Sequence, residues 1–525
     1  MIFDDPNLRK IDQAYIDSLD DIEIAKKLAS KLLEDLKEAR EKLNENPHNS
    51  SRPPSSAEPW VVAQIEEDTG KQEESDPGNE GDSSDSSDEK EADAKKRNRK
   101  KGGSRKPGKQ KEAEGKGRTQ KLSVTGTVIH FAQQCPICDQ ELTESDFTAC
   151  TGHYVIDIVM GKEDQPGITL TNTLHIYGDT ACACGYVSHT VAHRCAKEEE
   201  WDVELTEWHL VGPMLMSLIC CLAMRMRLSR RRIGEFLDDW LHLRLSTGTI
   251  NQCIHEAGRA CEPVVEKQLL QELRRASLLQ ADETSWKQNG KPYWMWVFIT
   301  VSTVLLIISR RTKETVKRIL GDFDGWLMSD GYIAYRDYPK RLRCWAHLQR
   351  KGEGLAESLN RKAQEFGEIV LSVLKTLMDA VYDARTRASP AEDLKAKYQR
   401  LLEKFRFVCE EYKYFAFQKN GKIYEKTQAL AREFLNDWEA IFRVLEHPHL
   451  PLTNNEAERI LRHWVILRRL CYGTRTKQGS RAVGLLASAI ETCRLRKVSP
   501  WEYLAETIAE RRKGLSPHAI PEPAR

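Results

Sequence analysis

The sequence lacks a long hydrophobic run. Its longest apolar stretch, residues 211–224, is too short to span a bilayer and is interrupted by Gly212 and Pro213. The first residues, beginning with Met1, have neither the basic nor the apolar region of a secretory signal peptide. We therefore expect a soluble, intracellular protein without membrane contact. Its 14 cysteines are then free thiols or metal ligands rather than disulfides.

The chain also lacks an excess of charge of one sign, with 80 Lys and Arg against 79 Asp and Glu. The charges are nevertheless segregated. Residues 66–93 hold 13 acidic and 2 basic side chains, and residues 95–121 hold 13 basic and 2 acidic ones. Together with the Ser, Pro and Gly content of residues 48–121, this predicts a disordered charged linker. Its basic half is either a non-specific contact for DNA phosphates or a solvated spacer.

Residues 8–46, before this linker, have the pattern of one helix. Apolar residues alternate spacings of three and four, as the a and d positions of about three heptads do: Ile22, Ala25, Ala29, Leu32, Leu36, Ala39 and Leu43. We expect a coiled coil that mediates self-association or partner binding. The alternative is an amphipathic helix packed on its own protein.

Two close cysteine pairs in residues 122–200 predict a small zinc-binding β domain. The pairs are Cys135-Pro-Ile-Cys138 and Cys182-Ala-Cys184, and the second is followed by Gly185, which allows a tight turn. The segments between them, 154–160 and 168–177, alternate like strands. Alternative ligands are Cys150, His153, His193 and Cys195. Without metal, the four cysteines would be unligated core residues.

Residues 205–276 are predicted to be helical and to contact DNA. A helix at 230–240 and a second at 248–260, capped by Ser246 or Thr247, resemble a helix-turn-helix. In that arrangement the second helix would present Thr249, Asn251 and Gln252 to base edges. A helical hairpin that binds nothing is the alternative.

From residue 277 to 350 the pattern changes to strands at 278–287, 293–301 and 304–309, a helix at 312–320 and a strand at 325–329. Asp282 lies in the first strand and Asp330 follows the last. These strands are neighbours in a ribonuclease-H-like fold, so the two carboxylates should meet. Two facing aspartates repel each other unless a cation neutralises them, and Mg²⁺ prefers carboxylate oxygens as ligands. Two such ions would allow the site to catalyse phosphoryl transfer.

A third carboxylate is expected from residues 451–515. Thr453 and Glu456 have the spacing of a capping box, which gives Glu456 a structural role and leaves Glu458 as the metal ligand. The same helix carries a row of arginines, which are either DNA contacts or a solvated face: Arg459, Arg462, Arg468 and Arg469.

Four motifs in this order resemble the large transposase of the insertion-sequence sixty-six family: Asp282-Glu-Thr, Ser329-Asp330-Gly-Tyr, Cys344-Trp-Ala-His347 and Asn454-Asn455-Glu-Ala-Glu458-Arg459. The resemblance implies a ribonuclease-H-like domain in which Asp282, Asp330 and Glu458 hold two Mg²⁺ ions, with Mn²⁺ as an alternative. It also implies a helical insertion at 351–450, for which helices at 365–387 and 391–411 are predicted. Cys344 and His347 would be structural or DNA-orienting. Gln349 departs from the adjacent basic pair of the family, which puts DNA contacts there in doubt.

These patterns predict a multidomain α+β protein that acts as a DNA transposase, cutting and joining the ends of a mobile element. Its expected partners are DNA, further copies of itself and, from the resemblance, small accessory proteins of the same element. The expected location is the bacterial cytoplasm. The alternatives are a catalytically inactive DNA-binding regulator, a nuclease for RNA–DNA hybrids and a zinc-containing scaffold.

Overall fold

The computed structural model describes residues 122–162, 164–195, 201–386, 393–419 and 422–522, together with Ser30, Leu36 and Gln120. Of the predicted N-terminal helix only Ser30 and Leu36 are described, and both are helical. The rest of that helix and, apart from Gln120, the predicted linker lie outside the described residues. Within the described part of the chain, no helix is long and apolar enough to cross a membrane.

A four-stranded sheet follows the linker. Its strands are β1 (Gly126–His130), β2 (Phe147–Lys162), β3 (Gln165–Ala181) and β4 (Val187–His189), with a 3₁₀ turn at Glu144–Asp146. β3 pairs with all three of the others, in parallel with β1 and antiparallel with β2 and β4. The strands predicted at 154–160 and 168–177 are thus confirmed within β2 and β3. A short pair, β5 (Arg194–Cys195) and β6 (Leu205–Thr206), comes next.

Four helices lead from the first sheet to the second: α5 (Pro213–Met224), α6 (Arg230–Leu241), α7 (Thr247–Pro263) and α8 (Leu270–Arg275), with a π-helical turn at Val264–Leu269. The hydroxyls of Ser229 and Ser246 accept hydrogen bonds from the first turns of α6 and α7. Both predicted helices are therefore confirmed. From Cys253 to Cys261 every residue of α7 is buried, so most of this helix belongs to the core and its exposed side chains lie before Cys253.

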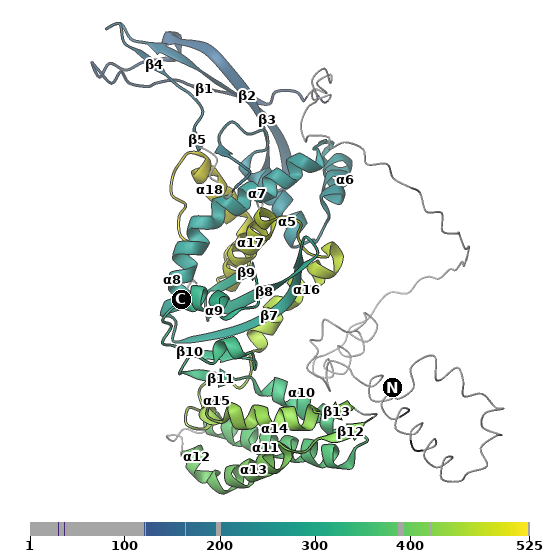
Figure 1. The fold of residues 1–525 in the computed structure, drawn as a ribbon. Coiled ribbons are helices and arrows are strands. Elements are labelled where there is room, and N and C mark those ends of the chain that lie inside the picture. The colour runs from purple at the N-terminus through teal and green to yellow at the C-terminus, as the bar shows by residue number, and fades with distance from the viewer. Residues whose placement is uncertain are drawn as a thin grey trace, which may run out of the picture. The chain divides into compact units, whose positions relative to one another are not determined.

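The second sheet has five strands in the order β11-β10-β7-β8-β9 (Figure 1). They are β7 (Leu278–Gln288), β8 (Lys291–Ile299), β9 (Val304–Ser309), β10 (Trp326–Ser329) and β11 (Arg341–Arg343), with α9 (Lys313–Leu320) between β9 and β10. β7, β8 and β9 are antiparallel, and β10 runs parallel to β7 and β11. The predicted order of strands and helix is confirmed. Asn289 and Gly290, both at positive φ, form the hairpin turn between β7 and β8.

Two C-terminal helices pack on this sheet (Figure 1). α16 (Asn455–Cys471) contacts β7 and β8, and α17 (Lys477–Leu495) contacts β9. An edge strand such as β9 presents unpaired backbone groups. On β9 they are satisfied by α17, because the Ser488 hydroxyl accepts from Leu306 N at 2.8 Å and the Thr492 hydroxyl accepts from Val304 N at 3.0 Å.

The predicted helical insertion contains α10 (Trp345–Ala356), α11 (Arg361–Thr386), α12 (Leu394–Lys397), α13 (Gln399–Tyr412), α14 (Lys426–Asn436) and α15 (Trp438–Phe442), with 3₁₀ turns at Ile333–Tyr335 and Arg443–Leu445 around it. A hairpin of β12 (Phe417–Lys419) and β13 (Lys422–Tyr424) joins α13 to α14. The helices enclose an aromatic core that includes Phe366, Phe405 and Phe434. The single helix predicted at 391–411 is wrong: Tyr398, at φ −100° and ψ 13°, leaves the helical region and separates α12 from α13.

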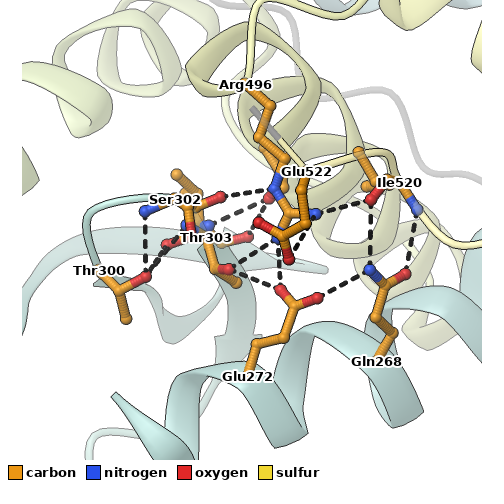
Figure 2. Close-up of polar contacts among 10 residues, drawn as sticks. Gln268, Glu272, Thr300, Ser302, Thr303, Arg496, Ile520 and Glu522 are labelled. Atoms are coloured by element: carbon orange, nitrogen blue, oxygen red, sulfur yellow. Dashed lines mark hydrogen bonds and ion pairs between the residues drawn. The ribbon is translucent and has the colours of Figure 1, made fainter. Parts of the chain in front are cut away.

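Arg496 ties the C-terminal segment after α18 (Pro500–Arg512) to the core (Figure 2). Its guanidinium donates to the carbonyl oxygens of Ser302 at 2.8 Å and Ile520 at 2.7 Å, and it also contacts Glu272 of α8. The side-chain oxygen of Gln268 also contacts Ile520, because it accepts a hydrogen bond from the backbone N of Ile520 at 3.1 Å. One buried arginine therefore joins the β8–β9 loop, the helix before β7 and the C-terminal tail.

Candidate active site and metal centres

The second sheet brings Asp282 and Asp330 together. β10 pairs in parallel with β7, with Met328 opposite Gln280. Two residues further along both strands, Asp330 comes level with Asp282. Carboxylate oxygens of these two residues and of Glu283 all lie within 4.8 Å of one another. The strand pairing thus creates a cluster of three carboxylates at the end of β10.

Both aspartates are oriented by backbone N–H groups, and Asp282 lies among other carboxylates. Asp282 Oδ1 accepts from Glu283 N, and Asp330 Oδ1 accepts from Tyr332 N, each at 2.9 Å. Burial, followed by the charges of Glu283, Asp330 and Glu458, raises the pKa of Asp282 well above its ordinary value. A cation placed among these oxygens would stabilise their ionised form.

Glu283 is a member of this cluster that the sequence did not indicate. Its buried carboxylate accepts from Arg311 Nη2 at 2.7 Å and from the Tyr335 hydroxyl at 2.9 Å. Burial, and next the charge of Asp330, raises the pKa of Glu283 to about 7 although Arg311 opposes the shift. The Arg311 guanidinium lies 3.9 Å from the centroid of the Tyr332 ring. Because neighbouring residues of a strand point to opposite faces, no pattern at 282–283 predicted that both would approach Asp330.

Glu458 lines the same cleft, at the start of α16. The cleft has a volume of about 760 Å³, and Asp282, Glu283 and Asp330 also line it. Glu458 Oε1 accepts from Arg350 Nη2 at 2.8 Å and lies 3.6 Å from His347 Nε2. Its closest potential ligand partners are Cys344 and His347 rather than the aspartates. The three predicted carboxylates therefore share one cleft but form two adjacent groups within it.

Cys344 and His347 lie between the second sheet and the start of α16. The buried Cys344 Sγ accepts from Asn454 N at 3.4 Å, and Trp345 N donates to Leu452 O at 2.9 Å. Burial, followed by the charges of Arg350 and Lys351, lowers the pKa of His347 to about 3. The imidazole is thus neutral at physiological pH. These contacts agree with the structural role expected for the pair.

The predicted capping box of Thr453 and Glu456 is wrong. α16 begins at Asn455, so its N-cap residue is Asn454, which makes no side-chain capping bond. The hydrogen bond from Asn454 N to Cys344 Sγ places the N-cap of α16 at Asn454, one residue later than the predicted N-cap, Thr453. Glu456 instead forms an ion pair with Arg459, three residues further along the helix. Glu456 and Glu458 still differ in environment, since only Glu458 lines the cleft.

Cationic side chains surround the carboxylates in the cleft, but several are already engaged. Arg468 donates to the hydroxyls of Thr284 at 2.8 Å and Ser285 at 2.9 Å, so it attaches α16 to β7. Arg462 also lines the cleft and is exposed, whereas Arg469, two turns further along α16, is half-buried and does not line it. The contact of Arg350 with Glu458 was not predicted from the sequence, although the i, i+3 spacing of Arg350 from His347 places both on one face of α10.

A buried charge network lies beneath the turn that carries Asp330. Arg343 of β11 forms ion pairs with Glu433 and Asp437 of the insertion, and Lys351 Nζ lies 2.7 Å from Glu433. Gly331 covers this network, because a Cβ atom at that position would lie 2.7 Å from Arg343 Nη2 and 2.9 Å from Glu433 Oε1. The insertion therefore supports the aspartate turn through these charges. Arg350 and Lys351 both have carboxylate partners.

The candidate base-reading residues lie in the first two turns of α7, before its buried part. Thr249 contacts the Ser246 hydroxyl at 2.9 Å, and Gln252 is exposed. Asn251 is half-buried, with its amide 3.4 Å from His255 Nε2. Because the residues from Cys253 to Cys261 are buried, DNA contact by this face of α7 would involve the residues before Cys253.

The four cysteines that were predicted to bind zinc lie together beside the four-stranded sheet. Cys135 Sγ lies 3.7 Å from Cys184 Sγ, and Cys138 Sγ lies 3.5 Å from Cys182 Sγ. Zn–S bonds of about 2.3 Å in a tetrahedron give edges of about 3.8 Å, so this arrangement could hold zinc. Gly185 has φ of +89°, which lets the second turn close. Hydrogen bonds from backbone N–H groups, that of Ile137 foremost, lower the pKa of Cys135 to about 7.

The alternative zinc ligands have other contacts. His153 Nε2 lies 2.9 Å from Glu207 O, and His193 Nδ1 lies 2.8 Å from Arg512 O. Cys150 Sγ donates to Thr148 O. The side chain of Cys195 lies outside the described part of the chain.

Comparison with known proteins identifies the family. The family model described as "Transposase IS66 family" matches residues 209–482, more than half of the chain and the part that holds Asp282, Asp330 and Glu458. The chain belongs to this family. The resemblance inferred from the four motifs is thereby confirmed.

Curated relatives come from Sinorhizobium fredii (strain NBRC 101917 / NGR234). Uncharacterized protein y4qI is 28% identical over 218 residues, which cover 39% of this chain and 39% of the relative. Uncharacterized protein y4hP is 24% identical over 220 residues, which cover 38% of this chain and 39% of that relative. The chain thus spans about two fifths of the length of these relatives.

Proposed function

We propose that this member of the IS66 transposase family is an active DNA transposase that cleaves and joins strands at the ends of a mobile element. The observation that carries the proposal is that Asp282, Asp330 and Glu458 line one cleft. The sheet order supports it: three antiparallel strands are followed by two parallel strands on the far side of the first, as expected for a ribonuclease-H-like fold.

The residues of the cleft fit divalent cations with hard oxygen ligands. Asp282 and Asp330 would hold Mg²⁺, or Mn²⁺ as an alternative, from the sheet, and Glu458 would hold it from α16. Such ions, when held there, would supply the charge that an in-line phosphoryl displacement requires at its attacking and leaving oxygens. Arg350 orients the carboxylate of Glu458. The neutral His347 lies 3.6 Å from the same carboxylate and adds no positive charge beside it.

DNA binding is assigned to three parts of the chain. Arg459 and Arg462, which line the cleft, and Arg469 further along α16 would contact phosphates, whereas Arg468 donates to Thr284 and Ser285 and attaches the helix to β7. The first two turns of α7, with Thr249, Asn251 and Gln252, would contact the element's ends. Residues 95–121 would add sequence-independent affinity. Self-association and accessory proteins remain proposals from the resemblance, and zinc at the four cysteines would stabilise the first sheet domain.

A catalytically inactive regulator with the same modules is the second candidate, and a cleavage assay separates the two. Full-length protein is mixed with labelled DNA that carries the element's ends, together with Mg²⁺, Mn²⁺, Ca²⁺ or a chelator, and strands are resolved on a denaturing gel. We expect nicks at the element ends and joined products with Mg²⁺ or Mn²⁺ alone. Tight, specific binding without cleavage in any metal would favour the regulator. Cleavage confined to the RNA strand of a hybrid would favour a nuclease.

A further inference from the structure

Tyr472, at the end of α16, combines an exposed ring with an unfavourable backbone conformation. Its φ of 57° and ψ of 16° lie in the left-handed region, and 82% of its surface is exposed. Helices often end in this conformation, but glycine usually occupies the position because a Cβ atom is disfavoured there. An exposed ring does not offset this strain by packing, which suggests that the ring is kept for a contact outside the chain.

The turn that carries Tyr472 is held rigidly between α16 and the β7–β8 hairpin. Tyr472 N donates to Arg468 O at 2.7 Å, and Thr474 N donates to Lys287 O at 2.8 Å. Asn289 N in turn donates to Thr474 O at 2.8 Å. Gly473, with φ of +105°, is pressed against the hairpin so closely that a Cβ atom would lie 2.1 Å from Lys287 O. The neighbouring structure therefore imposes both the conformation and the position of Tyr472.

The surroundings of this turn are cationic. The sequence contains no Asp or Glu between Glu283 and Glu314 or between Glu458 and Glu491, the two stretches that form the β7–β8 hairpin, most of α16 and the turn after it. The basic side chains of the hairpin tip and of the residues that follow Tyr472 are exposed: Lys287, Lys291, Arg475 and Lys477. This charge pattern is complementary to a nucleic-acid backbone.

The turn lies at a defined distance from the carboxylates. From Glu458 to Tyr472, α16 rises about 21 Å at about 1.5 Å per residue. From Asp282 to Gln288, β7 extends about 20 Å at about 3.3 Å per residue. These two lengths agree because α16 and β7 both run from the cleft to the tip of the β7–β8 hairpin. At about 3.4 Å per base pair, this distance corresponds to roughly six base pairs of DNA. By helical geometry, Tyr472 lies within about 40° of Glu458 around the α16 axis.

We propose that Tyr472 stacks on a DNA base about six base pairs from the phosphate held in the cleft, while the four exposed basic side chains contact the backbone. The inference rests on the proposed function and assigns a further DNA contact to the same surface. Aromatic rings stack on any base, so the contact would tolerate different sequences. It requires a base that is unpaired or displaced from the duplex.

Photocross-linking combined with a glycine substitution tests this contact. Full-length protein is bound in Ca²⁺ to end DNA that carries 5-iodouracil at single positions three to nine base pairs from the cleavage site, and cross-linked residues are identified by mass spectrometry. We expect a cross-link to Tyr472 centred near position six. Tyr472→Phe should keep the cross-link and the affinity. Tyr472→Gly should weaken end-DNA binding roughly 5- to 100-fold while its Tm stays equal or rises, because glycine relieves the backbone strain.

The controls separate this inference from the proposed function. Tyr414→Ala removes another exposed tyrosine, which lies in the insertion, and should leave binding unchanged. Wild-type affinity in Tyr472→Gly, or a cross-link that avoids Tyr472, would overturn the inference while leaving the transposase proposal intact. Loss of self-association in Tyr472→Gly without DNA would also overturn it, by identifying a protein interface. Failure of the wild-type protein to bind any end DNA would instead contradict the proposed function.

Discussion

Arg350 Nη2 donates a hydrogen bond of 2.8 Å to Oε1 of Glu458, and this contact joins α10 to the first turns of α16. Both side chains lie partly buried at the cleft. Arg350 also donates to Ala346 O one turn earlier, which fixes the direction of its guanidinium. The third carboxylate of the site is thus oriented by a residue of the helix that follows the Cys344 motif.

Removing this arginine should weaken metal binding more than DNA binding. Arg350→Met leaves Glu458 without its orienting donor, and such supporting contacts are worth roughly 10- to 100-fold in metal affinity or activity. We expect a correspondingly higher Mn²⁺ concentration for half-maximal cleavage, with end-DNA affinity within a few-fold of wild type. Arg350→Lys, which keeps the charge but not the planar fork, should be intermediate. An unchanged Mn²⁺ dependence in Arg350→Met would show that Glu458 is positioned without it.

Zinc should depend on the cysteine group and not on other thiols of the same domain. Purified protein should contain about one zinc per chain, because four cysteines at tetrahedral spacing make a closed structural site. Cys135→Ser with Cys138→Ser should lose this zinc and lower the Tm, as measured by atomic absorption and thermal denaturation. Cys150→Ser, which removes an exposed thiol of β2, is the matched control and should retain zinc. A metal-free wild-type protein with an unchanged fold would contradict the assignment.

The pKa of Glu283 predicts a pH-dependent effect of Mg²⁺ on stability. Burial raises this pKa from 4.5 to about 7, so the folded, metal-free protein binds more protons than the unfolded chain between these values. Its free energy of unfolding should therefore fall as pH rises through this window, and the raised pKa of Asp282 acts in the same direction. Bound Mg²⁺ would compensate the carboxylates as they ionise. Melting curves with and without Mg²⁺ should show a stabilisation that grows from about pH 5 to about pH 8, and less steeply in Glu283→Gln. A stabilisation independent of pH would refute this account.

Gly331 should not tolerate a side chain. Gly331→Ala would press a Cβ atom against the buried pair of Arg343 and Glu433, and overpacking of this kind costs about 1–3 kcal/mol. Because the same turn carries Asp330, cleavage should fall together with the Tm. Gly126→Ala, where no atom lies within 4 Å of the added Cβ, is the control and should keep the wild-type Tm. If Gly331→Ala melts and cleaves like wild type, the insertion does not support the turn in this way.

Local patterns predicted the sheet that carries Asp282 and Asp330, because alternation, turn residues and capping residues act over a few positions. They could not predict contacts set by tertiary packing. The start of α16 differs from the predicted one because Cys344, far away in sequence, accepts a hydrogen bond from Asn454 N. The partners of Glu458 likewise come from another element, α10. The sequence predicted that α7 would present an accessible recognition face to DNA, but most of its side chains are buried in the core. Glu283 joins the cluster through tertiary contacts as well, since its carboxylate accepts from Arg311 and Tyr335.

The measurement that tests the central claim most directly compares strand cleavage and end-DNA binding in four single variants of the full-length protein. Asp282→Asn, Asp330→Asn and Glu458→Gln keep the shape of each side chain but remove the charge that would hold the metal ions. We expect all three to lose cleavage with Mg²⁺ and to bind end DNA within a few-fold of wild type, since affinity comes mainly from phosphate contacts elsewhere. Glu456→Gln, whose carboxylate pairs only with Arg459 among the contacts of the described residues, is the matched control and should cleave. Cleavage by all three charge-removed variants with Mg²⁺ would contradict the proposed mechanism, and loss in Glu456→Gln with retention in Glu458→Gln would show that the wrong glutamate was assigned.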